Sequence, residues 1–147
     1  MEWRLEVVFV PVSDVERARA FYRDQVGFTE DFDSRFGDDV RMIQLTPPGS
    51  GCSVALLAGM SPGEPVRESM EPGSLNGLQI VVPDIDAART QLIANDVEVS
   101  EVVEMVQEDG RSIYRPVAGE PVGWNAYAFF DDLDGNGWIL QQSPPDM

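Results

Sequence analysis

The residues of this chain that could carry out acid–base or metal chemistry form an unusual set, because its 147 residues include no histidine. Histidine is the commonest metal ligand and the commonest general base in proteins. Acid–base chemistry here would use a carboxylate, a tyrosine, an arginine, water or the thiol of Cys52. Cys52 is the single cysteine, so it can form neither an internal disulfide nor a cysteine metal cluster. With no histidine to activate it, we expect this thiol to be inert rather than nucleophilic.

Aromatic and guanidinium side chains flank a segment rich in proline and glycine at residues 116–122. Arg111, Tyr114 and Arg115 precede this segment, and Trp124 and Tyr127 follow it. Rings and guanidinium groups can stack on a planar ligand, which makes this region a candidate ligand cover. The alternative is that these side chains pack beneath a long loop.

The charge of the chain excludes some partners. Ten basic residues against 26 acidic ones give a net charge of −16, which repels the phosphates of nucleic acids and anionic membrane surfaces. A solvated acidic surface accounts for this charge, and attraction of a cationic ligand is the alternative. No apolar stretch has membrane-spanning length, and residues 1–5 lack the apolar region of a secretory signal. The sequence predicts a cytoplasmic protein that binds neither nucleic acid nor membrane.

The elements that must position these residues fall into two similar halves. In the first half, the β-branched run at 5–12 predicts a strand, and Ser13 and Glu16 form the pattern of a capping box at the start of a helix that ends at Gly27. Further strands are predicted at 28–32, 40–46 and 53–57, with a hairpin turn at 47–51.

The second half repeats this order after residues 58–76, which are rich in turn formers and predict a linker. A strand is expected at 78–82, followed by a helix that Asp84 caps and that ends near Asn95. The later strand candidates are 97–103, a stretch around 112–114, 126–130 and 138–141. Residues 12–19 align with residues 82–89, with identical Val, Asp, Ala and Arg at matching positions. This match indicates an internal repeat, the alternative being coincidence at two ordinary helix starts.

Two motifs resemble one known superfamily. Residues 9–22, followed by Val-Gly-Phe at 26–28, resemble the opening of the vicinal oxygen chelate superfamily, which includes glyoxalase I, bleomycin-resistance proteins and extradiol dioxygenases. Asp132 to Trp138 resembles its closing turn, with Leu133 in place of the usual proline. The resemblance implies an α+β fold of two tandem βαβββ modules, whose curled sheets form a half-open barrel around a cleft. It implies one domain over 1–147, with module 1 at about 4–58, a linker at about 59–76 and module 2 at about 77–142.

The chain departs from this superfamily at the positions of the metal ligands. The position of the usual first-strand histidine is Val7, its counterpart in the second module is Gly77, and the usual closing glutamate falls at Ile139. The motifs do not fix the position of the fourth ligand, which is expected in or near residues 53–57, a stretch that contains no Asp, Glu or His. We therefore expect no metal and no other cofactor, and none of the ordinary glyoxalase I or dioxygenase chemistry.

The closing turn also matches the first half of a calcium-binding loop. Asp132, Asp134 and Asn136 have the spacing of the first EF-hand ligands. The twelfth position, which needs a bidentate glutamate, is Ser143. A structural turn is the favoured interpretation.

Strand alternation extends the lost ligand positions to a predicted binding surface. Side chains two residues apart share a face, so Phe9 joins Val7, Gln79 joins Gly77 and Gln141 joins Ile139. Together with the aromatic residues near the loop, the predicted ligand-binding residues are Val7, Phe9, Gly77, Gln79, Tyr114, Trp124, Tyr127, Ile139 and Gln141. This surface is apolar with two amides, which can orient a polar organic ligand. The alternative places both glutamines on an exposed sheet face.

These features predict metal-independent binding of a small, largely apolar organic molecule, as in resistance proteins that sequester a compound. The alternative is a metal-independent isomerase, cyclase or lyase of the same fold, for which the sequence identifies no catalytic residue. A third class is a structural or regulatory protein whose pocket has closed. We also predict a homodimer, because this superfamily often completes its barrel across a two-fold axis and exposed strand edges invite pairing.

Overall fold

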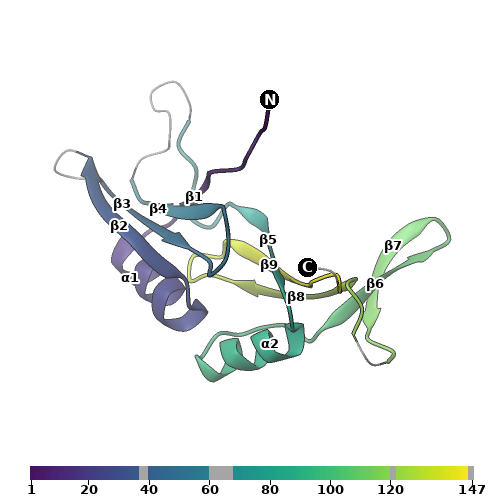
Figure 1. The fold of residues 1–147 in the computed structure, drawn as a ribbon. Coiled ribbons are helices and arrows are strands. Elements are labelled where there is room, and N and C mark those ends of the chain that lie inside the picture. The colour runs from purple at the N-terminus through teal and green to yellow at the C-terminus, as the bar shows by residue number, and fades with distance from the viewer. Residues whose placement is uncertain (37–39, 60–67, 120–121, 146–147) are drawn as a thin grey trace. The chain divides into compact units, whose positions relative to one another are not determined.

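The computed structural model describes residues 1–36, 40–59, 68–119 and 122–145. The chain forms two compact units, each with its own sheet and helix (Figure 1). Unit 1 consists of residues 1–76 and 132–136, and unit 2 of residues 77–131 and 137–147. No helix in the described ranges is long and apolar enough to cross a membrane.

Unit 1 has the βαβββ order that its sequence predicts. Its elements are β1 (Val7–Pro11), α1 (Val15–Ala20), the π-helical turn η1 (Phe21–Val26), β2 (Thr29–Phe36), β3 (Val40–Thr46) and β4 (Ser53–Leu57). The sheet order is β1-β4-β3-β2, with β1 parallel to β4 and the other pairs antiparallel. The helix lies along one face of this sheet (Figure 1), where Val10, Ile43, Leu45 and Leu56 are fully buried.

The first helix begins one residue later than the capping-box pattern suggests. Asp14 is the N-cap, and its carboxylate accepts a hydrogen bond from the Arg17 amide at 3.1 Å. Ser13 instead donates its hydroxyl to Asp134 at 2.6 Å, and Glu16 pairs with Arg19. The predicted box is therefore wrong, because the carboxylate of Asp14 satisfies the helix terminus while Ser13 is engaged elsewhere. The predicted end is confirmed, since Gly27 takes a left-handed conformation with φ 95°.

The closing turn is held by a buried network in unit 1. The Asp132 carboxylate accepts hydrogen bonds from the Tyr22 hydroxyl at 2.7 Å, the Asn136 side-chain amide at 2.8 Å, and the backbone amides of Asp134 and Asn136, both at 2.9 Å. Asn136 is fully buried and also donates to the Pro11 carbonyl. The carboxylate oxygens that a calcium ion would need are engaged by protein donors, which supports the structural interpretation of this turn.

Unit 2 repeats the βαβββ order with one added strand. Its elements are β5 (Asn76–Val82), α2 (Ile85–Ala94), β6 (Val103–Glu108), β7 (Arg111–Pro116), β8 (Ala126–Asp131) and β9 (Gly137–Gln142). Asp84 caps α2 as predicted, accepting from the Ala87 amide at 3.0 Å. The helix contacts β8 and β9, and the face of the sheet that contains Ala128, Phe130, Trp138 and Leu140 is buried.

The sequence placed one strand of unit 2 too early. Residues 97–102 form no strand, and β6 begins at Val103. Asp96 has φ 65°, and Ser100 bonds Phe129 through its own amide and its hydroxyl, both at 2.9 Å, so this segment is held by individual bonds rather than by a ladder. The β6–β7 hairpin turns through Asp109 and Gly110, both with positive φ, as tight hairpins require.

The two sheets confirm the internal repeat. In unit 1 the order is first, fourth, third and second strand. In unit 2 the order is β5-β9-β8-β6, which is the same sequence of roles, with β7 added at the edge. The expected α+β fold of tandem βαβββ modules is therefore present. That the two modules make one domain stays a prediction.

Candidate functional site

The face of the five-stranded sheet that does not contact α2 collects most of the predicted ligand-binding residues. Directly opposed residues in antiparallel strands share a face, and Tyr127 lies opposite both Gln141 and Val103, while Phe129 lies opposite Ile139. Tyr114 lies opposite Met105, two residues beyond Val103. We call this surface the aromatic face; it comprises Gln79, Val103, Met105, Tyr114, Tyr127, Phe129, Ile139 and Gln141.

Three rings form the centre of the aromatic face. The ring of Tyr114 meets Tyr127 at a centroid distance of 5.9 Å and Phe129 at 5.5 Å, both edge to face. Tyr127 is 7% exposed, whereas Tyr114 is 53% exposed. Edge-to-face rings within this distance attract one another, so the buried ring supports an exposed one. An exposed tyrosine ring over an aromatic floor can contact an apolar ligand while its hydroxyl stays in water.

The two predicted amides meet at the other end of this face. The Gln79 side-chain amide donates to the Gln141 side-chain oxygen at 2.5 Å, and the Gln141 amide donates to the backbone carbonyl of Trp124 at 3.2 Å. The sequence left open whether these glutamines lie in a pocket or on an exposed face. Gln79 is exposed and Gln141 is half-buried, so they lie on an open sheet face. Gln141 lies opposite Tyr127, and Gln79 is hydrogen-bonded to Gln141.

The predicted cover of rings and guanidinium groups is not assembled as expected. Strand alternation turns Arg111 and Arg115 to the face of the hairpin opposite Tyr114. There Arg115 pairs with Glu104 at 2.9 Å. Trp124 is 56% exposed, and the contact that joins it to the site is its backbone carbonyl. Two residues of the intervening segment, 120 and 121, lie outside the described residues.

Gly77 has a property that its sequence position did not reveal. It lies two residues before Gln79 on β5 with φ 96°, a left-handed conformation that residues with a side chain rarely adopt. A β-carbon placed there would meet nothing within 4 Å. A bulky substitution at Gly77 would therefore strain the backbone as well as occupy space.

Val7 and Phe9 lie on the corresponding face of unit 1. Both are half-buried, and they oppose Ser53 and Ala55 across the β1–β4 pair. These positions alternate with the buried residues that face the helix side, so the two side chains point to the opposite side of the sheet. In unit 1 the structure thus brings the two predicted residues together on one face, next to each other along β1.

The face of unit 1 that contains Val7 and Phe9 also carries a polar group that the sequence did not indicate. A bulge between Glu30 and Phe32 leaves Asp31 outside the regular β2–β3 register. Its carboxylate accepts from the Thr46 hydroxyl at 2.5 Å and from the Gln44 amide at 3.5 Å. A bulge redirects side chains, so strand alternation cannot predict where Asp31 points.

Phe129 of unit 2 is a second residue that the sequence analysis missed. It follows Tyr127 by two residues, so alternation alone could have placed it on the same face.

The metal-ligand positions do not fit a metal. Val7, Gly77 and Ile139 offer no ligating side-chain atom. Among the described residues, no group of three or more Cys, Asp or Glu side chains is arranged to hold a metal ion. The metal chemistry of the superfamily therefore has no ligand set in the described part of this chain.

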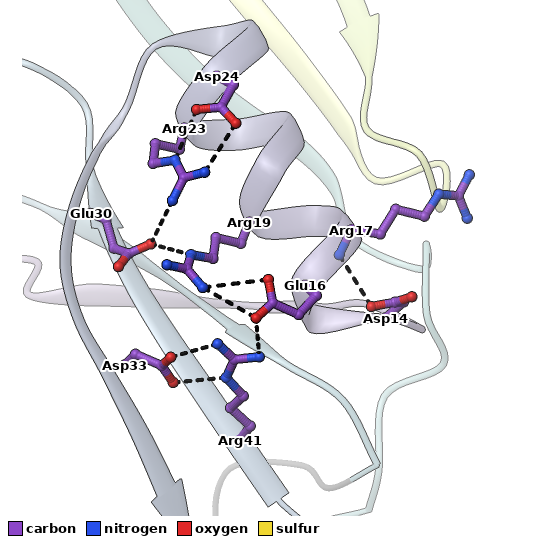
Figure 2. A network of polar contacts seen from close by, with 9 residues as sticks. All are labelled: Asp14, Glu16, Arg17, Arg19, Arg23, Asp24, Glu30, Asp33 and Arg41. Atoms are coloured by element: carbon purple, nitrogen blue, oxygen red, sulfur yellow. Dashed lines mark hydrogen bonds and ion pairs between the residues drawn. The ribbon is translucent and has the colours of Figure 1, made fainter.

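A cluster of ion pairs joins α1, β2 and β3 of unit 1 (Figure 2). Arg41 on β3 pairs with Asp33 on β2 and with Glu16 on α1, both at 2.5 Å. Arg19 joins Glu16 at 3.2 Å to Glu30 at 2.5 Å. Hydrogen bonds from Arg41 lower the pKa of both Asp33 and Glu16, so these carboxylates stay ionised and are not poised as general acids.

Cys52 behaves as expected of an unactivated thiol. It is half-buried, and its sulfur lies 3.6 Å from the Ser53 carbonyl. Burial, and then the charge of Glu6, raise the pKa of this thiol. A raised pKa reduces the thiolate fraction, which is the reactive form.

A hollow of about 390 Å³ in unit 2 borders the aromatic face at Pro116, which lies opposite Val103. Asp86, Glu101 and several apolar residues of 102–122 line it, and none of the predicted ligand-binding residues is among them. Both carboxylates are exposed. The aromatic face is the stronger candidate site, because its rings contact one another and its two amides are hydrogen-bonded to each other.

Three solved structures are similar to this chain over nearly its whole length. An antibiotic binding protein, TnmS3 from Streptomyces sp. CB03234, is 30% identical, with 96% of each chain covered and a TM-score of 0.69. A glyoxalase/bleomycin resistance protein from the same organism is 31% identical over 95% of this chain and 100% of that chain, with a TM-score of 0.68. A superfamily member from Sphaerobacter thermophilus DSM 20745 is 27% identical over 97% and 98% of the two chains, with a TM-score of 0.70. No curated protein matches the sequence significantly.

The sequence itself matches the superfamily over residues 4–140, which is most of its length. This match agrees with the tandem modules and with the motifs at both ends of the chain. The protein belongs to the Glyoxalase/Bleomycin resistance protein/Dioxygenase superfamily.

Proposed function

We propose that this protein binds a small, largely apolar organic molecule on the aromatic face, without a metal. The contact of Tyr114 with Tyr127 and Phe129 is the observation that carries the proposal. Rings of this kind bury a large apolar area per side chain and also stack on planar ligands. The similarity to an antibiotic binding protein at 30% identity supports ligand binding rather than a closed structural module.

Metal independence follows in this proposal from the residues at the ligand positions. Val7 and Ile139 are apolar and Gly77 has no side chain, so these positions supply apolar surface and space instead of charge. For Val7 and Phe9, which lie on a face of unit 1, ligand contact stays a prediction of its own. Elemental analysis of protein purified without chelator should find no stoichiometric zinc, nickel or iron; about one equivalent of any of these would refute this part of the proposal.

The binding proposal is tested with a neutral aromatic probe, 2-methoxynaphthalene, titrated by calorimetry. Replacing Tyr127 by Ala removes the ring that supports Tyr114, and we expect it to weaken probe binding about tenfold, on the scale of an aromatic pair and its buried area. The control is Tyr22→Phe, which removes a hydroxyl in unit 1 and leaves the aromatic face intact. Equal affinity of wild type and a folded Tyr127→Ala variant would show that the ligand binds elsewhere.

A metal-independent enzyme is the second candidate. Tyr127 is the observation that favours it, because a mostly buried phenol on the candidate surface could transfer a proton. Tyr127→Phe separates the two functions: it should abolish turnover of a substrate while leaving binding of an apolar probe nearly unchanged.

Homodimer formation, in which the exposed strand edges would pair, is proposed with either function and is tested by sedimentation at high micromolar concentration.

A further inference from the structure

The relay of hydrogen bonds on the aromatic face has a direction that chemistry alone determines. The Trp124 carbonyl can only accept a hydrogen bond, so the Gln141 side chain must present its nitrogen to it. The oxygen of Gln141 then faces Gln79, which must present its own nitrogen in turn. A backbone carbonyl at one end of the chain thus sets the orientation of both amides.

The oxygen of Gln79 is the end point of this relay. Within the described ranges, its nitrogen bonds Gln141, and no protein donor reaches its oxygen. The amide is exposed, so its oxygen is accessible to a ligand on the same surface. A flip of the Gln79 amide would turn its nitrogen toward the ligand and its oxygen toward the oxygen of Gln141. Two oxygens would then face each other, and the hydrogen bond between the glutamines would be lost.

Charge on this surface limits which ligand group can use that acceptor. The central positions of the aromatic face, from Val103 and Met105 to Phe129 and Gln141, hold no charged side chain, and Asp131 stands at the end of β8. The hairpin arginines lie on the other face. An anionic ligand would meet no counter-charge here and would be repelled by a chain of net charge −16.

From these observations we infer that Gln79 is a specificity-determining residue, and that the aromatic face selects neutral aromatic molecules bearing a hydrogen-bond donor, such as a phenolic hydroxyl. The aromatic body contacts Tyr114 and its neighbours, and the hydroxyl donates to the Gln79 oxygen. This inference rests on the proposed function, because it assigns a ligand class to the same surface.

The test compares 2-naphthol with 2-methoxynaphthalene, in which a methyl group replaces the donor hydrogen of the hydroxyl. At pH 7, where both probes are neutral, wild type should bind 2-naphthol about three- to tenfold more tightly, the range of one net hydrogen bond. Gln79→Met should abolish this preference while changing the affinity for 2-methoxynaphthalene less than about twofold. Gln141→Met should also reduce the preference, because the Gln79 amide loses the partner that orients it.

Gln107→Met is the matched control, since Gln107 is a glutamine on the same face of the hairpin, bonded to Ser112 at 2.6 Å. This variant should keep the full preference for 2-naphthol. Two outcomes would overturn the inference: wild type binds both probes equally, or Gln79→Met keeps the preference for 2-naphthol. The proposed function would survive either outcome if 2-methoxynaphthalene still binds wild type and binds Tyr127→Ala more weakly. Failure of both probes to bind wild type would overturn the proposed function and the inference together.

Discussion

Substitution of Asn136 by Asp tests the buried network that holds the closing turn. The side chain of Asn136 is fully buried, and both its nitrogen and its oxygen are hydrogen-bonded. The nitrogen donates to the Pro11 carbonyl at 2.9 Å and to the Asp132 carboxylate at 2.8 Å. The oxygen accepts from the Leu75 amide at 3.1 Å. Aspartate has the same shape but places an oxygen where the nitrogen was. Two acceptors would then face another acceptor at hydrogen-bond distance.

The cost follows from those two lost donors. Stranding a buried partner costs about 1–3 kcal/mol, so the loss of both predicts a destabilisation of about 4 kcal/mol at pH 8. Two carboxylates that share a site raise the pKa of one of them. Because that folded-state pKa lies above the unfolded value, the variant binds an extra proton when folded, and its deficit shrinks as the pH falls through the folded pKa.

The assay is urea unfolding of wild type and variant at pH 8 and pH 5.5, compared at each pH. Asn125→Asp is the matched control: this side chain donates one bond, to the Met105 carbonyl at 2.9 Å, and bonds no carboxylate of the described residues. Its loss should be smaller and nearly independent of pH. A deficit for Asn136→Asp below about 1 kcal/mol at pH 8, or one that is equal at both pH values, would refute the argument.

Three further outcomes are expected. Arg41→Met should lower the Tm at pH 7, and the difference should shrink as the pH falls below the ordinary carboxyl range, because the stability from the lowered pKa values of Asp33 and Glu16 is lost as the pH falls through their folded pKa values; a difference as large at pH 3 as at pH 7 would contradict this. Gly73→Ala should cost roughly 2 kcal/mol or more of unfolding free energy in urea titration, since Gly73 has φ 81° and a β-carbon would lie 2.0 Å from the Asp134 carbonyl oxygen. Cys52 should react with iodoacetamide at pH 7.5 more slowly than glutathione, and Glu6→Gln should speed the reaction; a rate equal to that of glutathione would show that the raised pKa has no effect.

Local patterns determined the elements of this protein well. β-Branched runs predicted strands such as 40–46 and 53–57, and Asp84 and Gly27 marked a helix start and a helix end that the structure confirms. These signals are short-range, because they depend on backbone conformation and on neighbouring hydrogen bonds. Alternation placed Gln141 on the same strand face as Ile139, whereas Tyr127 was predicted from its place beside the loop, and only the structure pairs Tyr127 with Gln141.

Only the tertiary structure decided how the polar groups are used. The Ser13 pattern predicted a cap, but a partner 121 residues away engages its hydroxyl. Asp31 reaches its face through a bulge between Glu30 and Phe32, which strand alternation cannot predict. A polar side chain can hydrogen-bond several kinds of partner, and it bonds the ones that folding brings within about 3 Å. The sequence alone does not predict which partners those are. The direction of the Gln79–Gln141 relay is likewise set by the Trp124 carbonyl, a backbone group that no pattern of side chains reveals.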